Sequence, residues 1–100
     1  MNYQEAHKIL ERRRLLKLAH EYRQKGYSVD IYPTSGKLPP TLANLSLDLI
    51  AVKGSEVIAA KVRTRETLSL NGSEDLRRIS ESVEKLPGWV FELVVTNSRT

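Results

Sequence analysis

Two charged side chains stand inside apolar, strand-like segments, and they are the residues of this chain best suited to chemistry. Asp48 lies in the segment 47–53 and Lys61 in the segment 56–63, both otherwise rich in Val, Ile, Leu and Ala. Burying a charge is costly unless it is paired or bound to a metal. The two side chains therefore either pair with each other or belong to a metal-dependent phosphodiesterase site. In such a site a carboxylate holds Mg²⁺ and a cation stabilises the developing negative charge.

A predicted β-hairpin over residues 47–66 positions both side chains. Gly54 and Ser55 separate its strands, and glycine at the first central position suits a two-residue turn because it accepts a positive φ. We expect Asp48 and Lys61 on neighbouring strands with their head groups within reach, and, without metal, an ion pair between them. The residue two before Lys61 shares its face of the strand. A second carboxylate there would complete the site, but that residue is Ala59.

The N-terminal half predicts a helix and a strand before this hairpin. The helix runs from residue 2 or 3 to Lys25, since the stretch lacks Gly and Pro and Gly26 provides a stop. A strand is predicted over 27–33. The loop over 34–44 contains one helical turn that starts at a proline.

After the hairpin, the sequence predicts one more helix and one more strand. Ser73 is a favourable N-cap, and Pro87-Gly88 ends the helix. Four apolar residues at helical spacing form a stripe that packs on a sheet: Leu76, Ile79, Val83 and Leu86. The last strand is predicted over 89–96, so the order is α-β-β-β-α-β.

Length and composition favour one small domain over 1–100. There is no cysteine, so disulfides and thiolate zinc sites are excluded. No apolar run approaches the ~20 residues of a membrane span, and the N-terminus lacks the apolar core of a signal peptide. We expect a cytoplasmic protein without a membrane partner. The chain stops four residues after the last predicted strand, which suggests the N-terminal domain of a longer protein.

Positive charge is concentrated at the start of the chain. Residues 1–26 carry seven Lys or Arg against three acids, a net +4, whereas the remaining residues carry nine of each. The centre of this charge is Arg12, Arg13 and Arg14. A local basic surface indicates a polyanionic partner, although the same residues would also suit a solvated helix face. The helix is apolar on more than one side, which favours a second contact, such as a homodimer or an additional C-terminal domain.

The chain resembles the PD-(D/E)XK superfamily of restriction-endonuclease-like nucleases, and within it a bacterial subgroup similar to archaeal Holliday junction resolvases. The resemblance covers nearly the whole chain, and these segments carry it: 20–23, 25–27, 48–51, Lys61 with Arg63, 66–68 and 87–95. It implies an α/β fold with the αβββαβ restriction-endonuclease-like core, a mixed four-stranded sheet flanked by two helices.

The resemblance also implies roles for individual residues. Asp48 matches the metal-binding Asp, and Lys61 matches the lysine that orients water or stabilises the transition state. An intact family site would use Mg²⁺ or Mn²⁺. Members often add an acid from the first helix, for which Glu11 is preferred over Glu5. DNA is the implied partner, and the expected phosphate contacts come from five arginines: Arg12, Arg13, Arg14, Arg63 and Arg65.

Two positions depart from the family motif. Leu47 replaces the motif proline, which affects only how the strand begins. Ala59 stands at the position of the motif Glu. A metal-ligand carboxylate is therefore missing, and no bound metal is expected. Three explanations remain open: a natural pseudonuclease, an engineered inactivating substitution, or an acid relocated to Glu56 or Glu66.

Three functions are therefore compatible with the sequence. The first is a DNA endonuclease domain that is inactive in this copy. The second is a nuclease fold kept as a binding platform for DNA or a protein. The third is a dimerisation domain of a larger protein.

Overall fold

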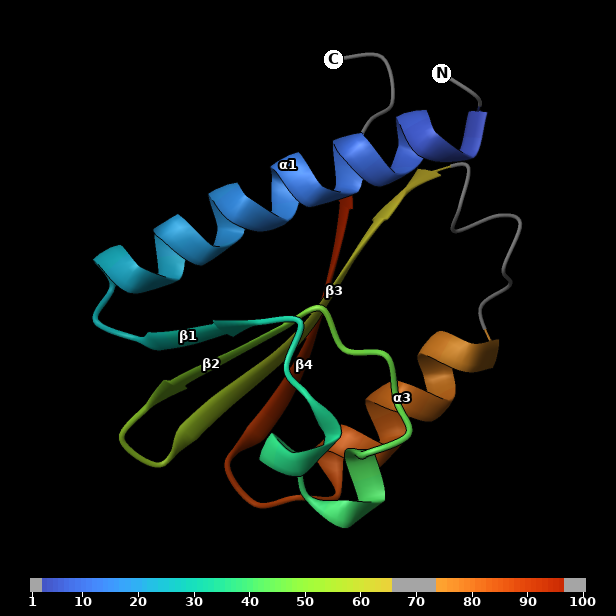
Figure 1. Cartoon of the computed structure of the whole chain (residues 1–100). Coiled ribbons are helices and arrows are strands. Elements are labelled where there is room, and N and C mark those ends of the chain that lie inside the picture. The colour runs from blue at the N-terminus through green and yellow to red at the C-terminus, as the bar shows by residue number, and fades with distance from the viewer. Residues whose placement is uncertain (1–2, 66–73, 97–100) are drawn as a thin grey trace.

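The structure is a computed structural model that describes residues 3–65 and 74–96. Its elements, in chain order, are α1 (Tyr3–Gln24), β1 (Ser28–Ile31), the 3-10 turns η1 (Ser35–Lys37) and η2 (Pro40–Leu42), β2 (Leu49–Lys53), β3 (Glu56–Thr64), α3 (Glu74–Glu84) and β4 (Trp89–Thr96). The strands form a mixed sheet in the order β1-β2-β3-β4, with only β3 and β4 parallel. Helix α1 covers one face of the sheet and α3 the other (Figure 1). The predicted α/β fold class is confirmed.

Helix α1 ends at Gln24, one residue before the predicted end, and the reason is a local capping motif. Gly26 adopts φ 93°, which glycine accepts without a Cβ penalty. Its N–H donates to the Arg23 carbonyl, and the Tyr27 N–H donates to the Tyr22 carbonyl, each at 3.1 Å. This is the bonding pattern of a Schellman motif. The rings of Tyr22 and Tyr27 meet edge to face at 5.0 Å and close the cap with an apolar contact.

The predicted hairpin is confirmed, with one difference at its start. Lys53 pairs with Glu56 across the two-residue turn, and Gly54 has φ 61° as the turn requires. Strand β2 begins at Leu49 rather than at residue 47. Asp48 therefore lies immediately before the strand.

The other predicted elements are present with small shifts in their ends. Strand β4 has the predicted bounds, β1 is shorter than predicted, and η2 is the predicted helical turn. In α3, Ile79 and Val83 are buried as the stripe requires. The proposed N-cap, Ser73, lies outside the described residues. Among the described residues, no helix is long and apolar enough to cross a membrane.

The core has two layers because strand side chains alternate between the two faces of the sheet. On the α1 face, Ile58, Ala60 and Val62 of β3 pack with Leu15 and other residues of the helix. On the α3 face, Ala59 packs in a second cluster that includes Ile79 and Val83 of α3. The side of β3 on which a residue lies thus decides which helix it meets.

Candidate functional site

Asp48 is held at the junction of three strands. Its backbone N–H donates to the Ala60 carbonyl at 3.0 Å, and its carbonyl accepts from the Tyr32 N–H at 2.8 Å. Its Oδ2 atom accepts from the Val62 backbone N–H at 2.8 Å and from Nη1 of Arg63 at 3.1 Å. The side chain is 18% exposed. A backbone N–H and a guanidinium therefore fix the position of this carboxylate at the edge of the core.

Strand alternation breaks at Asp48. Leu47 packs in the cluster beneath α3, whereas Leu49 packs in the cluster beneath α1. Two residues that far apart in one regular strand would share a face, so the backbone changes direction between them. The carboxylate of Asp48 consequently reaches the α1 side of β3, where the N–H of Val62 is available.

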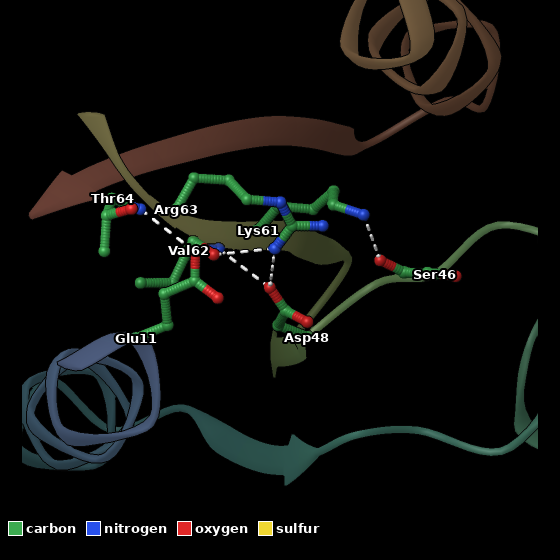
Figure 2. A network of polar contacts seen from close by, with 7 residues as sticks. All are labelled: Glu11, Ser46, Asp48, Lys61, Val62, Arg63 and Thr64. Atoms are coloured by element: carbon green, nitrogen blue, oxygen red, sulfur yellow. Dashed lines mark hydrogen bonds and ion pairs between the residues drawn. The ribbon is translucent and has the colours of Figure 1, made fainter. Parts of the chain in front are cut away.

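Glu11 approaches the same region from α1. Its Oε2 atom accepts a hydrogen bond from the backbone N–H of Thr64 at 3.0 Å. Figure 2 shows the Glu11 and Asp48 side chains on the α1 side of β3, with Val62 between them along the strand. Glu11 thus lies in the same hollow as Asp48, and its role as the acid expected from the first helix stays a prediction. The side chain of the other candidate, Glu5, lies outside what the structure describes.

The expected ion pair between Lys61 and Asp48 is wrong. Lys61 is 4% exposed, and its Nζ donates to the Ser46 carbonyl at 2.6 Å. It lines a hollow beside η2 and α3, whereas Asp48 lines a different hollow beneath α1. Figure 2 shows the Lys61 amine extending away from Asp48 toward Ser46. The partner of Asp48 is Arg63, whose Nη1 lies 3.1 Å from its Oδ2.

The expectation that a side chain at position 59 would face Asp48 is also wrong. Ala59 is fully buried and pairs in register with Ile50 of β2 and Phe91 of β4. It belongs to the apolar cluster beneath α3. A larger side chain at 59 would enter that cluster rather than the neighbourhood of Asp48.

The three consecutive arginines of α1 have different surroundings. Arg12 lies with its guanidinium 5.7 Å from the centre of the Tyr32 ring. Arg14 forms an ion pair with Glu21 at 3.4 Å and lines a separate groove between α1 and β4. Arg13 is exposed to solvent, as is Arg65 beyond the end of β3. Only Arg12 of the three lines the hollow that contains Asp48, because successive helical residues point in different directions.

That hollow, which we call the Asp48 hollow, has a volume of about 310 Å³. Its polar lining comes from six residues: Lys8, Glu11, Arg12, Tyr32, Asp48 and Arg63. Sequence reasoning missed Tyr32, and one signal could have found it. It is an aromatic residue that directly follows β1, at the end of that strand which lies beside Asp48.

The donor set of this hollow does not fit a divalent metal. Mg²⁺ prefers several oxygen ligands, usually carboxylates supplemented by water. In residues 3–65 and 74–96 no group of three or more His, Cys, Asp or Glu side chains converges as a metal site. Oδ2 of Asp48 already accepts two hydrogen bonds, and one of them comes from a cation. The positive guanidinium at this oxygen would repel a second cation.

A second groove lies between α1 and β4, with a volume of about 360 Å³. There the Tyr22 hydroxyl donates to Oε1 of Glu92 at 2.9 Å. Burial, and next the hydrogen bond to this carboxylate, raise the pKa of Tyr22 above its ordinary value. A tyrosine whose pKa is raised is a weaker acid, so this contact stabilises the protonated hydroxyl. We assign it a structural role in joining α1 to the edge strand.

Comparison with known proteins agrees with the fold described above. A family model for AHJR-like restriction endonucleases, REase_AHJR-like, matches residues 3–100. No curated protein and no solved structure matches the chain. The matched residues include all the helices and strands described above, and with them Glu11, Asp48 and Arg63. The chain therefore belongs to the AHJR-like family of restriction-endonuclease-like domains.

Proposed function

We propose that this nuclease-fold domain binds DNA through the Asp48 hollow and does not hold the divalent metal with which related nucleases cleave it. The observation that carries the proposal is the contact between Arg63 and Asp48 at 3.1 Å. A metal-dependent site needs its carboxylates free to bind the metal. Here an internal cation neutralises the carboxylate and remains 21% exposed, where it is suited to a phosphate.

The geometry also supports a different placement of the family's acid-x-lysine motif. Ala59 is not among the residues of β3 that contact Asp48. Instead, the Asp48 main chain bonds to Ala60, and its carboxylate bonds to Val62 and Arg63. Of positions 59, 61 and 63, only position 63 brings its side chain to Asp48, since Lys61 donates to Ser46 in another hollow. This chain has an arginine there, so β3 brings a cation and no acid to Asp48.

Charge around the hollow supports a polyanionic ligand. Lys8, Arg12 and Arg63 line it together with two acids, and one of those acids is already paired with Arg63. Guanidinium groups bind phosphate oxygens in a bidentate geometry. Since the excess positive charge of the chain lies within residues 1–26, helix α1 brings that charge to the same side of the sheet.

The first test is the salt dependence of DNA binding, measured by fluorescence anisotropy. Each phosphate neutralised contributes about 0.9 to the slope of log K against log salt. Arg12→Gln should lower the magnitude of that slope by about 1. Arg13→Gln is the matched control, because it removes the same charge from an exposed neighbour outside the hollow. Equal effects of the two substitutions would show that only diffuse charge on α1 matters, and an absence of binding would refute the proposal.

A second candidate function is a metal-dependent endonuclease similar to archaeal Holliday junction resolvases. One observation favours it: Glu11 and Asp48 are two carboxylates that line one hollow. The test is nicking of supercoiled plasmid with Mg²⁺ or Mn²⁺, with Asp48→Asn as control. Our proposal predicts no metal-dependent nicking by the protein. Nicking that disappears in Asp48→Asn would favour the second candidate instead.

A further inference from the structure

Tyr32 adopts a backbone conformation that its side chain makes unfavourable. Its φ is 51°, and within the described part of the chain it is the only residue other than glycine with a positive φ. This left-handed region is costly for residues that carry a Cβ, and least so for Asn and Asp. Such strain persists only where the surrounding structure enforces it, and it is concentrated at functional sites. Here the Tyr32 N–H is held by the Asp48 carbonyl at 2.8 Å.

The ring of Tyr32 is also open to solvent, with the residue 49% exposed. An aromatic residue kept in a strained conformation for packing would be expected inside the core. Instead, the ring borders the Asp48 hollow, and the guanidinium of Arg12 lies 5.7 Å from its centre. A cation over one face of an aromatic ring is a favourable contact, and it orients the ring beside the basic residues of the hollow.

The size and chemistry of the hollow fit one nucleotide. Its volume of about 310 Å³ lies near the lower end of the range for small-ligand pockets, roughly 300–1,000 Å³. A paired duplex segment is too large to enter, whereas one base with its phosphate is not. The hollow offers an aromatic surface for the base, and Lys8, Arg12 and Arg63 for the phosphate. Stacked bases and basic grooves are the two elements with which proteins bind single-stranded nucleic acid.

We infer that Tyr32 is a stacking platform for one unpaired base of DNA, whose adjoining phosphate is held by Arg12 and Arg63. This inference rests on the proposed DNA binding and names the form of DNA that the hollow selects. A base paired within a duplex has both faces covered by its neighbours, so it cannot stack on the ring. DNA that carries an unpaired nucleotide next to a duplex should therefore bind more tightly than a fully paired duplex of the same length.

Three proteins test the inference, each measured by fluorescence anisotropy against both DNAs: the unsubstituted chain, Tyr32→Gly and Tyr32→Phe. Glycine accepts φ 51° without strain, so Tyr32→Gly removes the ring while keeping the backbone conformation. Phenylalanine keeps the ring and removes only the hydroxyl. Tyr32→Gly should bind the DNA with an unpaired nucleotide about tenfold more weakly, as expected for the loss of one stacked base. Tyr32→Phe should bind it as the unsubstituted protein does.

The fully paired duplex separates this inference from the proposed function. Its affinity should be unchanged in Tyr32→Phe and should fall by much less than tenfold in Tyr32→Gly, because a paired base cannot stack on the ring. If the unsubstituted protein binds both DNAs equally and Tyr32→Gly binds both as well, the stacking role is refuted while DNA binding stands. If the unsubstituted protein binds neither DNA, the proposed function fails as well. A fluorescent base analogue at the unpaired position should lose emission on binding, and that loss should be absent with Tyr32→Gly.

Discussion

At the scale of single residues, the position that a side chain occupies along β3 decides which partner it meets. Arg63 reaches Asp48, whereas Lys61 donates to Ser46 in another hollow. Ala59 lies in the apolar cluster beneath α3. Positions 59, 61 and 63 all have the two-residue spacing that the family motif requires, so spacing alone cannot distinguish among them. The contacts that each residue makes in the folded protein distinguish them.

This distinction gives a prediction for two engineered variants. Ala59→Glu should place a carboxylate in an apolar core and lower the free energy of unfolding by about 3 kcal/mol or more, because a buried charge without a partner is strongly destabilising. It should gain no metal site. Arg63→Glu replaces the guanidinium at Asp48 with a carboxylate in the same hollow. We expect this variant to bind Mn²⁺ or Mg²⁺, since the carboxylates at positions 11, 48 and 63 would then line one hollow without the arginine.

Thermal unfolding with and without metal measures both variants. A ligand that binds the folded state raises its melting temperature with concentration. Arg63→Glu should show that rise, whereas the unsubstituted protein and Ala59→Glu should not. A metal-dependent rise in Ala59→Glu alone would instead support the motif placement at 59.

At the scale of elements, glycines at the chain reversals determine how strands and helices meet. Gly88 joins α3 to β4 with φ 82°, and its carbonyl accepts from the Val57 N–H at 2.9 Å. A Cβ added there would lie 2.5 Å from the backbone carbonyl oxygen of Ser55. The turn after α3 and the turn of the hairpin are thus packed backbone to backbone, which aligns β4 beside β3.

We therefore predict that Gly88→Ala lowers the free energy of unfolding by about 2 kcal/mol or more. A left-handed conformation contributes roughly 1–2 kcal/mol of that cost, and the clash with a backbone atom adds to it. Gly36→Ala is the matched control, because its added Cβ meets nothing within 4 Å and its φ is not in the positive range. Urea denaturation of both variants measures the difference, and equal stability would contradict the packing described for Gly88.

At the scale of the whole molecule, contacts across the sheet link the first element to the last. The hydrogen bond from Tyr22 to Glu92 joins α1 to β4, residues 70 apart in the chain. The exposed Ile9 and Leu16 of α1, 43% and 46% exposed, are compatible with the partner surface expected from the sequence. That expectation stays a prediction.

The raised pKa of Tyr22 makes stability depend on pH in the alkaline range. Burial, then the hydrogen bond to Glu92, raise this pKa above its unfolded value of about 10. The contribution is therefore fully present below pH of about 10 and decreases as the pH rises above it, since the unfolded chain then loses the proton first. Tyr22→Phe should lose about 1 kcal/mol near neutral pH for the missing hydrogen bond, and its stability should fall less steeply above pH of about 10.

Urea denaturation at several pH values measures this slope. Tyr27→Phe is the comparison, because the pKa of Tyr27 is raised mainly by its hydrogen bond to Glu56 at an exposed site. Solvent screening reduces such a surface contribution. The pH dependence of the free energy of unfolding above pH of about 10 should therefore change less in Tyr27→Phe than in Tyr22→Phe. An identical slope in the unsubstituted protein and Tyr22→Phe would contradict the role assigned to Tyr22.

The sequence by itself determined the order of the elements, because local signals specify them. Gly26 ends α1, and Gly54 with Ser55 makes the hairpin turn. The apolar stripe also predicted α3, and the apolar run over 89–96 predicted β4, since burial on a sheet requires those patterns. Asp48 and Glu11 could be named as site residues from the resemblance to the nuclease family.

Only the tertiary structure decided which residues meet Asp48. The reversal of alternation between Leu47 and Leu49 has no local sequence signal, since both are leucines that could pack on either face. Bonds from Tyr32 of one neighbouring segment and Ala60 of another hold the backbone there. Those bonds turn the carboxylate toward Arg63 and place the strained Tyr32 beside it. A one-residue change of face exchanges every neighbour of a strand residue, so the chemistry of this site depends on contacts that sequence spacing does not encode.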